Sequence, residues 1–223
     1  MKSEKALFPL IEFFGKCNEQ TYVYLIVRTI CELYSERAVE PLLKLLNISQ
    51  NELTLMFAAC GLGELRSEDA IEPLILLLEK SKSEQTKIEA SSALCQLIPK
   101  DKENIIIELL EKKQYGENLK YVSYILGKIG SKRSVSPLIN LLGNSNNNIV
   151  LRYTAEALSE INTKDVFASL IHLIENNTDE NTLIYSSYAL GMIGSSNALD
   201  PLIKLMEESH NVTILDALAL SLS

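Results

Sequence analysis

The chain has 223 residues, and its contents of 47% hydrophobic and 22% charged residues are typical of an ordinary globular protein. Its formal net charge of -8 disfavours non-specific binding of nucleic acid, because an acidic surface repels phosphate groups. No stretch approaches the roughly 18 apolar residues that a membrane-spanning helix needs.

The amino-terminal segment does not resemble a targeting sequence. A short apolar run follows Lys5, but Pro9 and Glu12 interrupt it, whereas a secretory signal needs a longer apolar stretch. The four cysteines have neither CxxC nor zinc-ligand spacing, and they are Cys17, Cys31, Cys60 and Cys95. We therefore expect reduced thiols in a cytoplasmic protein, with no metal or other cofactor.

Proline reveals a period of 32 residues. Successive prolines lie 32, 32, 64 and 64 residues apart, at Pro9, Pro41, Pro73, Pro137 and Pro201. Ile105 and Ser169 occupy the two vacant positions of this grid. Each of the seven positions precedes two apolar residues, a variable one and two more apolar ones, which is the buried stripe of an amphipathic helix. Six residues earlier, every repeat except the one with Pro99 has a Ser or Thr, a favourable N-cap.

A second helix follows in each repeat. Its deepest apolar column is Ile30, Leu62, Leu94, Leu126, Leu158, Leu190 and Leu222. Small residues occupy the positions that we expect to face the next repeat, including Gly63, Gly127 and Gly191. Small side chains allow helix axes to approach to about 8–9 Å. Cys31 and Cys95 share the glycine column, so we interpret them as packing residues.

The segments LKYVSYILGKIG at 119–130 and SVSPLINLL at 134–142 resemble the bilin-lyase-like (PBS lyase) HEAT-like repeat, V-R-x-x-A-A-x-A-L-G-x-I-G-D followed by A-V-x-P-L-x-x-L-L. The resemblance extends over residues 3–223. It implies an all-α fold, an α-α superhelix (HEAT-like solenoid) of seven 32-residue helix pairs in a single domain, 1–223. The units would start near residues 3, 35, 67, 99, 131, 163 and 195, with the last one truncated. The arginine of the family pattern is present only at Arg152, and its aspartate is replaced by Ser or Thr.

In this family the second helices line the concave surface, where we expect a partner to bind. A helical wheel places Tyr121, Tyr153 and Tyr185 there at consecutive 32-residue steps. The full set of predicted partner-binding residues is Tyr121, Tyr124, Tyr153, Tyr185, Tyr188, Phe57, Lys128, Glu156 and Met192. Tyrosine is enriched at interfaces, and an extended peptide or a helix would fit such a groove. The alternative is a structural role, in which the rings stack on one another and cover the inner wall.

The sequence offers no catalytic constellation, and we expect no enzymatic activity. His172 is on the solvent side of a first helix and His210 is in an interhelical loop. No P-loop, H-E-x-x-H or G-x-S-x-G pattern is present. The His–Glu pairs of HEAT-type iron hydroxylases are missing as well.

The leading hypothesis is a cytoplasmic scaffold or adaptor that binds another protein in its concave groove. One variant is an inhibitor or immunity-type partner of a basic protein. The resemblance also leaves open a chromophore–protein lyase subunit, while DNA recognition of the kind seen in HEAT-like alkylpurine glycosylases is disfavoured by the acidic charge. The apolar run between Ala217 and Leu222 further predicts self-association through the carboxy-terminal end.

Overall fold

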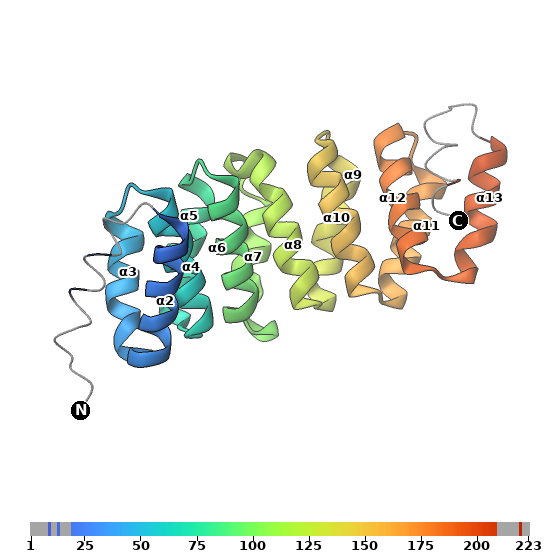
Figure 1. The fold of residues 1–223 in the computed structure, drawn as a ribbon. Helices are drawn as coiled ribbons and strands as arrows, with labels where there is room; N and C mark the ends of the chain where they lie inside the picture. The colour runs from blue at the N-terminus through green and yellow to red at the C-terminus, as the bar shows by residue number, and fades with distance from the viewer. Residues whose placement is uncertain (1–8, 10–12, 14–18, 209–218, 220–223) are drawn as a thin grey trace. The chain divides into compact units, whose positions relative to one another are not determined.

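The computed structural model describes residues 19–208 and the single positions 9, 13 and 219, and every regular element in this part is helical. The fold is an α-α solenoid built from helix pairs (Figure 1). Its helices are α2 (Gln20–Tyr34), α3 (Val39–Ile48), α4 (Glu52–Glu64), α5 (Ile71–Lys80), α6 (Glu84–Leu97), α7 (Asn104–Leu110), α8 (Leu119–Ile129), α9 (Val135–Asn144), α10 (Asn148–Ile161), α11 (Lys164–Asn176), α12 (Glu180–Ile193) and α13 (Leu199–Glu208).

The chain divides into two compact units, 1–99 and 100–223. Unit 1 contains α2 to α6, and unit 2 contains α7 to α13. The boundary coincides with the least regular repeat, where Pro99 replaces the usual Ser or Thr and Ile105 replaces proline. The single seven-repeat domain over 1–223 stays a prediction. The helix expected around Pro9 and the last second helix, with its apolar carboxy-terminal run, lie largely outside the described residues.

Most described first helices open with a single 3-10 turn, after which an α-helix begins. Proline is then the third α-helical residue, as at Pro73 of α5 and Pro137 of α9. Backbone N–H groups in the first turn have no carbonyl partner within the helix, so the missing proline N–H costs little there. Ser131 and Thr163 accept hydrogen bonds from Arg133 N and Val166 N, which confirms them as caps.

Ser67 departs from the predicted capping pattern. It precedes the 3-10 turn Glu68–Ala70 in extended conformation, but its side chain makes no capping hydrogen bond. The backbone N–H of Ala70 instead bonds to the carbonyl of Ser67.

The predicted apolar columns form the core of both units. The column after the proline position is at most 1% exposed throughout, at Leu42, Leu74, Ile106, Leu138, Leu170 and Leu202. The second-helix column is fully buried at Ile30, Leu62, Leu94, Leu126, Leu158 and Leu190. Each such side chain contributes about 1.5–3 kcal/mol by leaving water. The 32-residue period therefore places one pair of anchors in every described helix pair.

Small residues allow consecutive second helices to approach closely. A Cβ added at Gly127 of α8 would lie 2.8 Å from Ala157 Cα of α10. In unit 1, a Cβ at Gly63 of α4 would lie 3.0 Å from Ala93 Cα of α6. The prediction that the glycine column serves packing is thus confirmed at both positions.

In each unit, one carboxylate at the start of a helix accepts hydrogen bonds from the next repeat. Glu103 is fully buried and accepts hydrogen bonds from Ser131 Oγ at 2.6 Å and Ser134 Oγ at 3.1 Å. Glu52 is half-buried and accepts from Ser81 Oγ at 2.7 Å and the backbone N–H of Lys82 at 3.0 Å. Hydrogen bonds to a charged acceptor are stronger than neutral ones, so both contacts fix the loops that separate the helices.

Candidate partner-binding surface

The second helices of unit 2 present a surface rich in tyrosine. Helix α10 packs against α8 on one side and α12 on the other (Figure 1). Asn147 and Asp179 cap the amino termini of α10 and α12 with their side chains, which sets where each helix begins. Four tyrosines and one methionine project from these helices with part of each side chain in solvent. This tyrosine face consists of Tyr124, Tyr153, Tyr185, Tyr188 and Met192.

Two predicted partner-binding residues do not have the exposure that the helical wheel suggested. Tyr121 is 3% exposed and Phe57 is 7% exposed, so neither offers a surface for a partner. Phe57 belongs to unit 1, where its ring lies 6.0 Å from that of Tyr24. The wheel considered each helix alone, whereas burial also depends on the elements packed around it, such as Tyr24 of α2 beside Phe57. For both residues the expected exposure is wrong.

Cations cover part of the exposed rings. The Lys128 ammonium lies 5.4 Å from the ring centre of Tyr124, and the Arg152 guanidinium lies 4.7 Å from that of Tyr153. A cation over an aromatic face contributes about 0.5–1 kcal/mol at an exposed site. The rings are therefore held in place before any partner arrives.

Each of these cations is also paired with a carboxylate. Lys128 bonds to Glu160 of α10 at 2.7 Å, and Arg152 bonds to Glu156 at 2.8 Å. Both pairs are open to solvent in part, so each contributes at most about 1 kcal/mol. These two ion pairs give the tyrosine face as many negative as positive charges. Such a surface suits a protein partner better than a polyanion.

Tyr185 and Met192 link α12 to the same surface. Burial raises the pKa of Tyr185, and the nearby charge of Arg152 offsets part of that effect. Ser159 Oγ of α10, which donates a hydrogen bond to the carbonyl of Glu156 at 2.7 Å, lies 3.8 Å from Met192 Sδ. Met192 is nevertheless 49% exposed, so apolar area remains open to solvent at this end of the tyrosine face.

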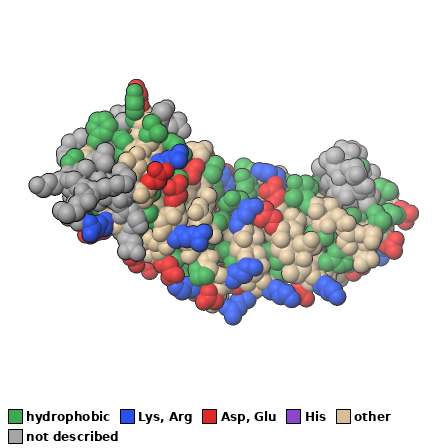
Figure 2. Space-filling model, turned by 60° about the horizontal axis from the view of Figure 1, so that its bottom comes forward, with side chains coloured by type: hydrophobic (Ala, Val, Ile, Leu, Met, Phe, Trp, Pro, Cys, Tyr) green, Lys and Arg blue, Asp and Glu red, His purple; other side chains and the backbone are tan. Residues whose placement is uncertain are grey.

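The charges elsewhere on the molecule are mixed as well. Figure 2 shows acidic and basic side chains interspersed between hydrophobic ones over the face in view. Among the described residues no group of three or more His, Cys, Asp or Glu side chains could hold a metal ion. No described helix is long and apolar enough to cross a bilayer.

The residues considered for chemistry lie apart from the tyrosine face or outside the described part. Cys31, Cys60 and Cys95 form no disulfide bond. Burial raises the pKa of Cys31 to about 12 and that of Cys60 to about 11, which keeps these two thiols protonated and unreactive at neutral pH. His172 is exposed on α11, as predicted, and His210 lies outside the described residues.

The helical wheel also places Glu160 on the outward face and Arg152 near it, although it does not show how the four charges pair. A usable signal existed for both pairs. Arg152 and Glu156 are four residues apart on one helix, the usual spacing of an ion pair. Lys128 and Glu160 are one repeat apart, so they occupy equivalent positions on adjacent helices.

Comparison with known proteins agrees with the repeat pattern. The pattern of HEAT repeats matches residues 71–159, 103–183 and 135–223, which together span more than half of the chain. The chain belongs to the HEAT repeat family. One stretch of this HEAT repeat protein, residues 56–80, also matches the PBS lyase HEAT-like repeat. A search of curated proteins finds no match.

Solved structures with similar helical repeats show low sequence identity. Human deoxyhypusine hydroxylase in complex with glycerol aligns over 98% of this chain and 88% of its own, with 13% identity and a TM-score of 0.43. An engineered protein aligns over 97% of this chain and 67% of its own, with 18% identity and a TM-score of 0.40. A second engineered protein aligns over 97% and 95%, with 20% identity and a TM-score of 0.33.

Proposed function

We propose that this HEAT repeat protein is a non-catalytic scaffold or adaptor that binds another protein through the tyrosine face of α8, α10 and α12. The observation that carries the proposal is the run of half-exposed tyrosines on three adjacent second helices, ending in the exposed Met192. HEAT repeats commonly serve protein interaction, which agrees with this reading.

The surface has the properties of a protein-binding site. Tyrosine supplies apolar area and a hydroxyl with little loss of side-chain entropy, and it is frequent among residues that dominate binding energy. Arg152 and Lys128 hold two of the rings through contacts of 4.7 and 5.4 Å, which lowers the ordering cost of binding. The paired carboxylates leave hydrogen-bond acceptors at the rim for a polar partner.

The structural alternative, in which the tyrosines only line the wall, predicts contacts between their rings. On the tyrosine face, Tyr124 and Tyr153 each lie against a cation, and part of each of the four tyrosine side chains stays in solvent. Ring area left in solvent favours a binding role over a purely structural one. Inhibition of a basic protein, lyase activity and a cytoplasmic location stay predictions.

Site-specific photocrosslinking tests the proposal. A benzophenone amino acid would replace Tyr188 on α12 and, in a matched control, Ser92 on α6, which occupies the same repeat position in unit 1. After irradiation in a lysate of the source organism, we expect a protein adduct at Tyr188 and none at Ser92. Equal yields of the same adducts at both positions would contradict a partner site on the tyrosine face.

A further inference from the structure

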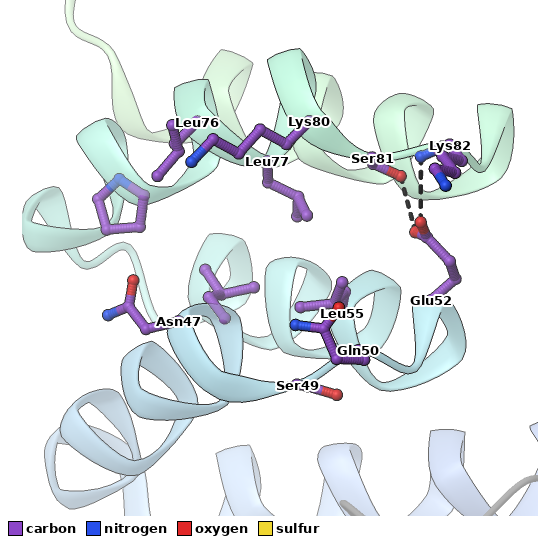
Figure 3. A pocket seen from close by; sticks show the side chains of 12 residues that line it. Asn47, Ser49, Gln50, Glu52, Leu55, Leu76, Leu77, Lys80, Ser81 and Lys82 are labelled. Atoms are coloured by element: carbon purple, nitrogen blue, oxygen red, sulfur yellow. Dashed lines mark hydrogen bonds between the residues drawn. The ribbon is translucent and has the colours of Figure 1, made fainter.

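A cavity lies on unit 1, where the first helices α3 and α5 meet the start of the second helix α4. Its volume is about 490 Å³, within the range of ligand pockets. Its walls come from the end of α3, the start of α4, and α5 with the loop after it. Figure 3 shows Leu76, Leu77 and Lys80 of α5 on one side, with Asn47, Gln50 and Leu55 on the opposite side.

The cavity has an apolar floor. Leu55 and Leu77 are 8% and 6% exposed, and Leu46 and Pro73 complete this part of the lining. Leu76 stands at the opening with 42% of its side chain exposed. Apolar area brought against Leu76 would remove this side chain from water.

Leu76 breaks a pattern that holds in every other repeat. The variable position of the first helix carries Glu12, Lys44, Leu76, Glu108, Asn140, His172 and Lys204. Six of these seven residues are polar, as expected for a side chain in water, and the exception lies at the cavity. Only this repeat, moreover, has lysine both four and six residues after the variable position, at Lys80 and Lys82.

The fixed charge at the opening is positive. Lys80 and Lys82 are exposed, and within the described residues no ion pair holds either ammonium group. Glu52 is the one carboxylate among the residues that line the cavity. Its oxygens accept hydrogen bonds from Ser81 Oγ and Lys82 N at 2.7 and 3.0 Å, and Figure 3 shows it at one end of the opening.

The Glu52 carboxylate already accepts hydrogen bonds from within the protein. Burial alone raises the pKa of Glu52, but the hydrogen bonds from Ser81 and Lys82 outweigh burial and lower it. The carboxylate is thus ionised at neutral pH and directed to the backbone of the following loop. The two lysines remain to meet charge on an occupant.

We propose that this α3–α5 groove is a second docking site, and that its occupant is a short segment of a partner protein with a large apolar side chain flanked by acidic residues. The apolar side chain would cover Leu76 and enter above Leu55 and Leu77. The acidic side chains would pair with Lys80 and Lys82. A groove of this volume accommodates a few side chains rather than a folded domain.

Peptide binding with methyl NMR tests this site. The probe is an equimolar pool of labelled decapeptides with a central Leu or Phe between glutamates, and the matched pool has lysine in place of glutamate. Fluorescence anisotropy measures binding, and methyl chemical shifts of the groove leucines show where the peptides bind. We expect the acidic pool to bind, the basic pool not to bind, and shifts centred on Leu76, Leu77 and Leu55.

Three variants make the test specific. Leu76→Asn places at this position the residue found at Asn140, and it should weaken binding about fivefold or more through lost apolar contact. The double variant Lys80→Glu, Lys82→Glu should weaken it about tenfold or more through charge reversal. The control Lys44→Glu, Lys132→Glu makes the same change in net charge at exposed positions outside the cavity lining, and its affinity should stay within about twofold of wild type.

The proposal is overturned if neither pool binds, or if the basic pool binds as well as the acidic one. It also fails if the control loses as much affinity as the groove variants, or if the methyl shifts fall on α10 and α12. Concentration-dependent self-association that Leu76→Asn abolishes would replace the partner segment by a second copy of this chain. Shifts on α10 and α12 would support binding at the tyrosine face, whereas the other results do not bear on it, so failure of this site and failure of the proposed function can be told apart.

Discussion

The second helices of the two units use the same packing but present different surfaces. In unit 1, Gly63 of α4 faces Ala93 of α6, and in unit 2 Gly127 of α8 faces Ala157 of α10. The outward positions of α6 are Glu89, Ser92 and Gln96, whereas those of α12 are Tyr185, Tyr188 and Met192. The repeat determines how the helices approach, while the outward positions are free to change. Function should therefore be sought where equivalent positions differ.

The largest effect should come from residues that share a column but differ in burial. Phe57 and Tyr121 are 7% and 3% exposed, whereas Tyr153 in the same column is half-exposed. Phe57→Ala and Tyr121→Ala should each lower the free energy of unfolding by about 3–5 kcal/mol, because each leaves a cavity. Tyr153→Ala should cost clearly less. Urea unfolding followed by circular dichroism measures the stability of all three variants. Equal losses would contradict the difference in burial between the first two rings and that of Tyr153.

The next effect concerns the shared glycine contact. Gly127→Val should destabilise the protein by about 3 kcal/mol, because its Cβ would lie 2.8 Å from the backbone of Ala157. Gly63→Val should behave alike in unit 1, where the corresponding distance is 3.0 Å. Gly143→Ala is the control, since its Cβ would meet Leu173 Cδ2 at 3.4 Å and alanine favours the helix by about 0.5–1 kcal/mol. If Gly127→Val unfolds at the same urea concentration as wild type, that result contradicts the close approach of α8 to α10.

The two carboxylates that hold a loop through hydrogen bonds, Glu103 in unit 2 and Glu52 in unit 1, differ in burial. Glu103→Ala in unit 2 should cost about 2 kcal/mol, because the buried hydroxyl of Ser134 and that of Ser131 lose their acceptor. Glu52→Ala in unit 1 should cost about 1 kcal/mol, since water replaces part of the lost interaction. Chemical denaturation ranks the two variants, and the reverse order would show that burial does not govern these contacts.

Glu52 also predicts a dependence on pH. Its folded-state pKa is lowered, so the stability it contributes is present above the unfolded-state pKa and is lost as pH falls through the folded-state pKa. The difference in unfolding free energy between wild type and Glu52→Gln should therefore shrink as the solution is acidified from neutral pH. A difference that grows toward acid pH would give the opposite sign and contradict the hydrogen-bonding account.

The smallest effect concerns thiol reactivity in unit 1. Burial raises the pKa of Cys60 from 9.0 to about 11, which lowers its thiolate fraction about 100-fold at a given pH. Alkylation by iodoacetamide, followed by peptide mass spectrometry, should be slower at Cys60 than at the same residue in the urea-unfolded chain. Equal rates in both states would show that the site is open to solvent.

Much of the fold follows from periodicity in the sequence. Buried columns such as Leu42 to Leu202 and Ile30 to Leu190 recur every 32 residues, and a recurring apolar stripe can form a core only if its helices stack. The glycine column predicted close approach for a similar reason. The 3-10 turns before the prolines were not predicted, because capping side chains are compatible with both helix types.

The candidate surface was predictable only in part. Wheel geometry placed Tyr153, Tyr185 and Tyr188 correctly at the surface, but it failed for Tyr121 and Phe57, whose burial depends on neighbouring helices. The α3–α5 groove was missed for a different reason. A cavity arises between helices, so no single helix reveals it, although the apolar Leu76 in a polar column marked the place.

Affinity capture tests the central claim, that the tyrosine face binds a partner and its counterpart in unit 1 does not. Wild type would be compared with the triple variant Tyr153→Ala, Tyr185→Ala, Tyr188→Ala. The control is a second triple variant, Glu89→Ala, Ser92→Ala, Gln96→Ala, and circular dichroism would first show that all three proteins are helical. We predict a protein that wild type and the control retain and the tyrosine variant loses. Capture of the same proteins by all three would contradict the account.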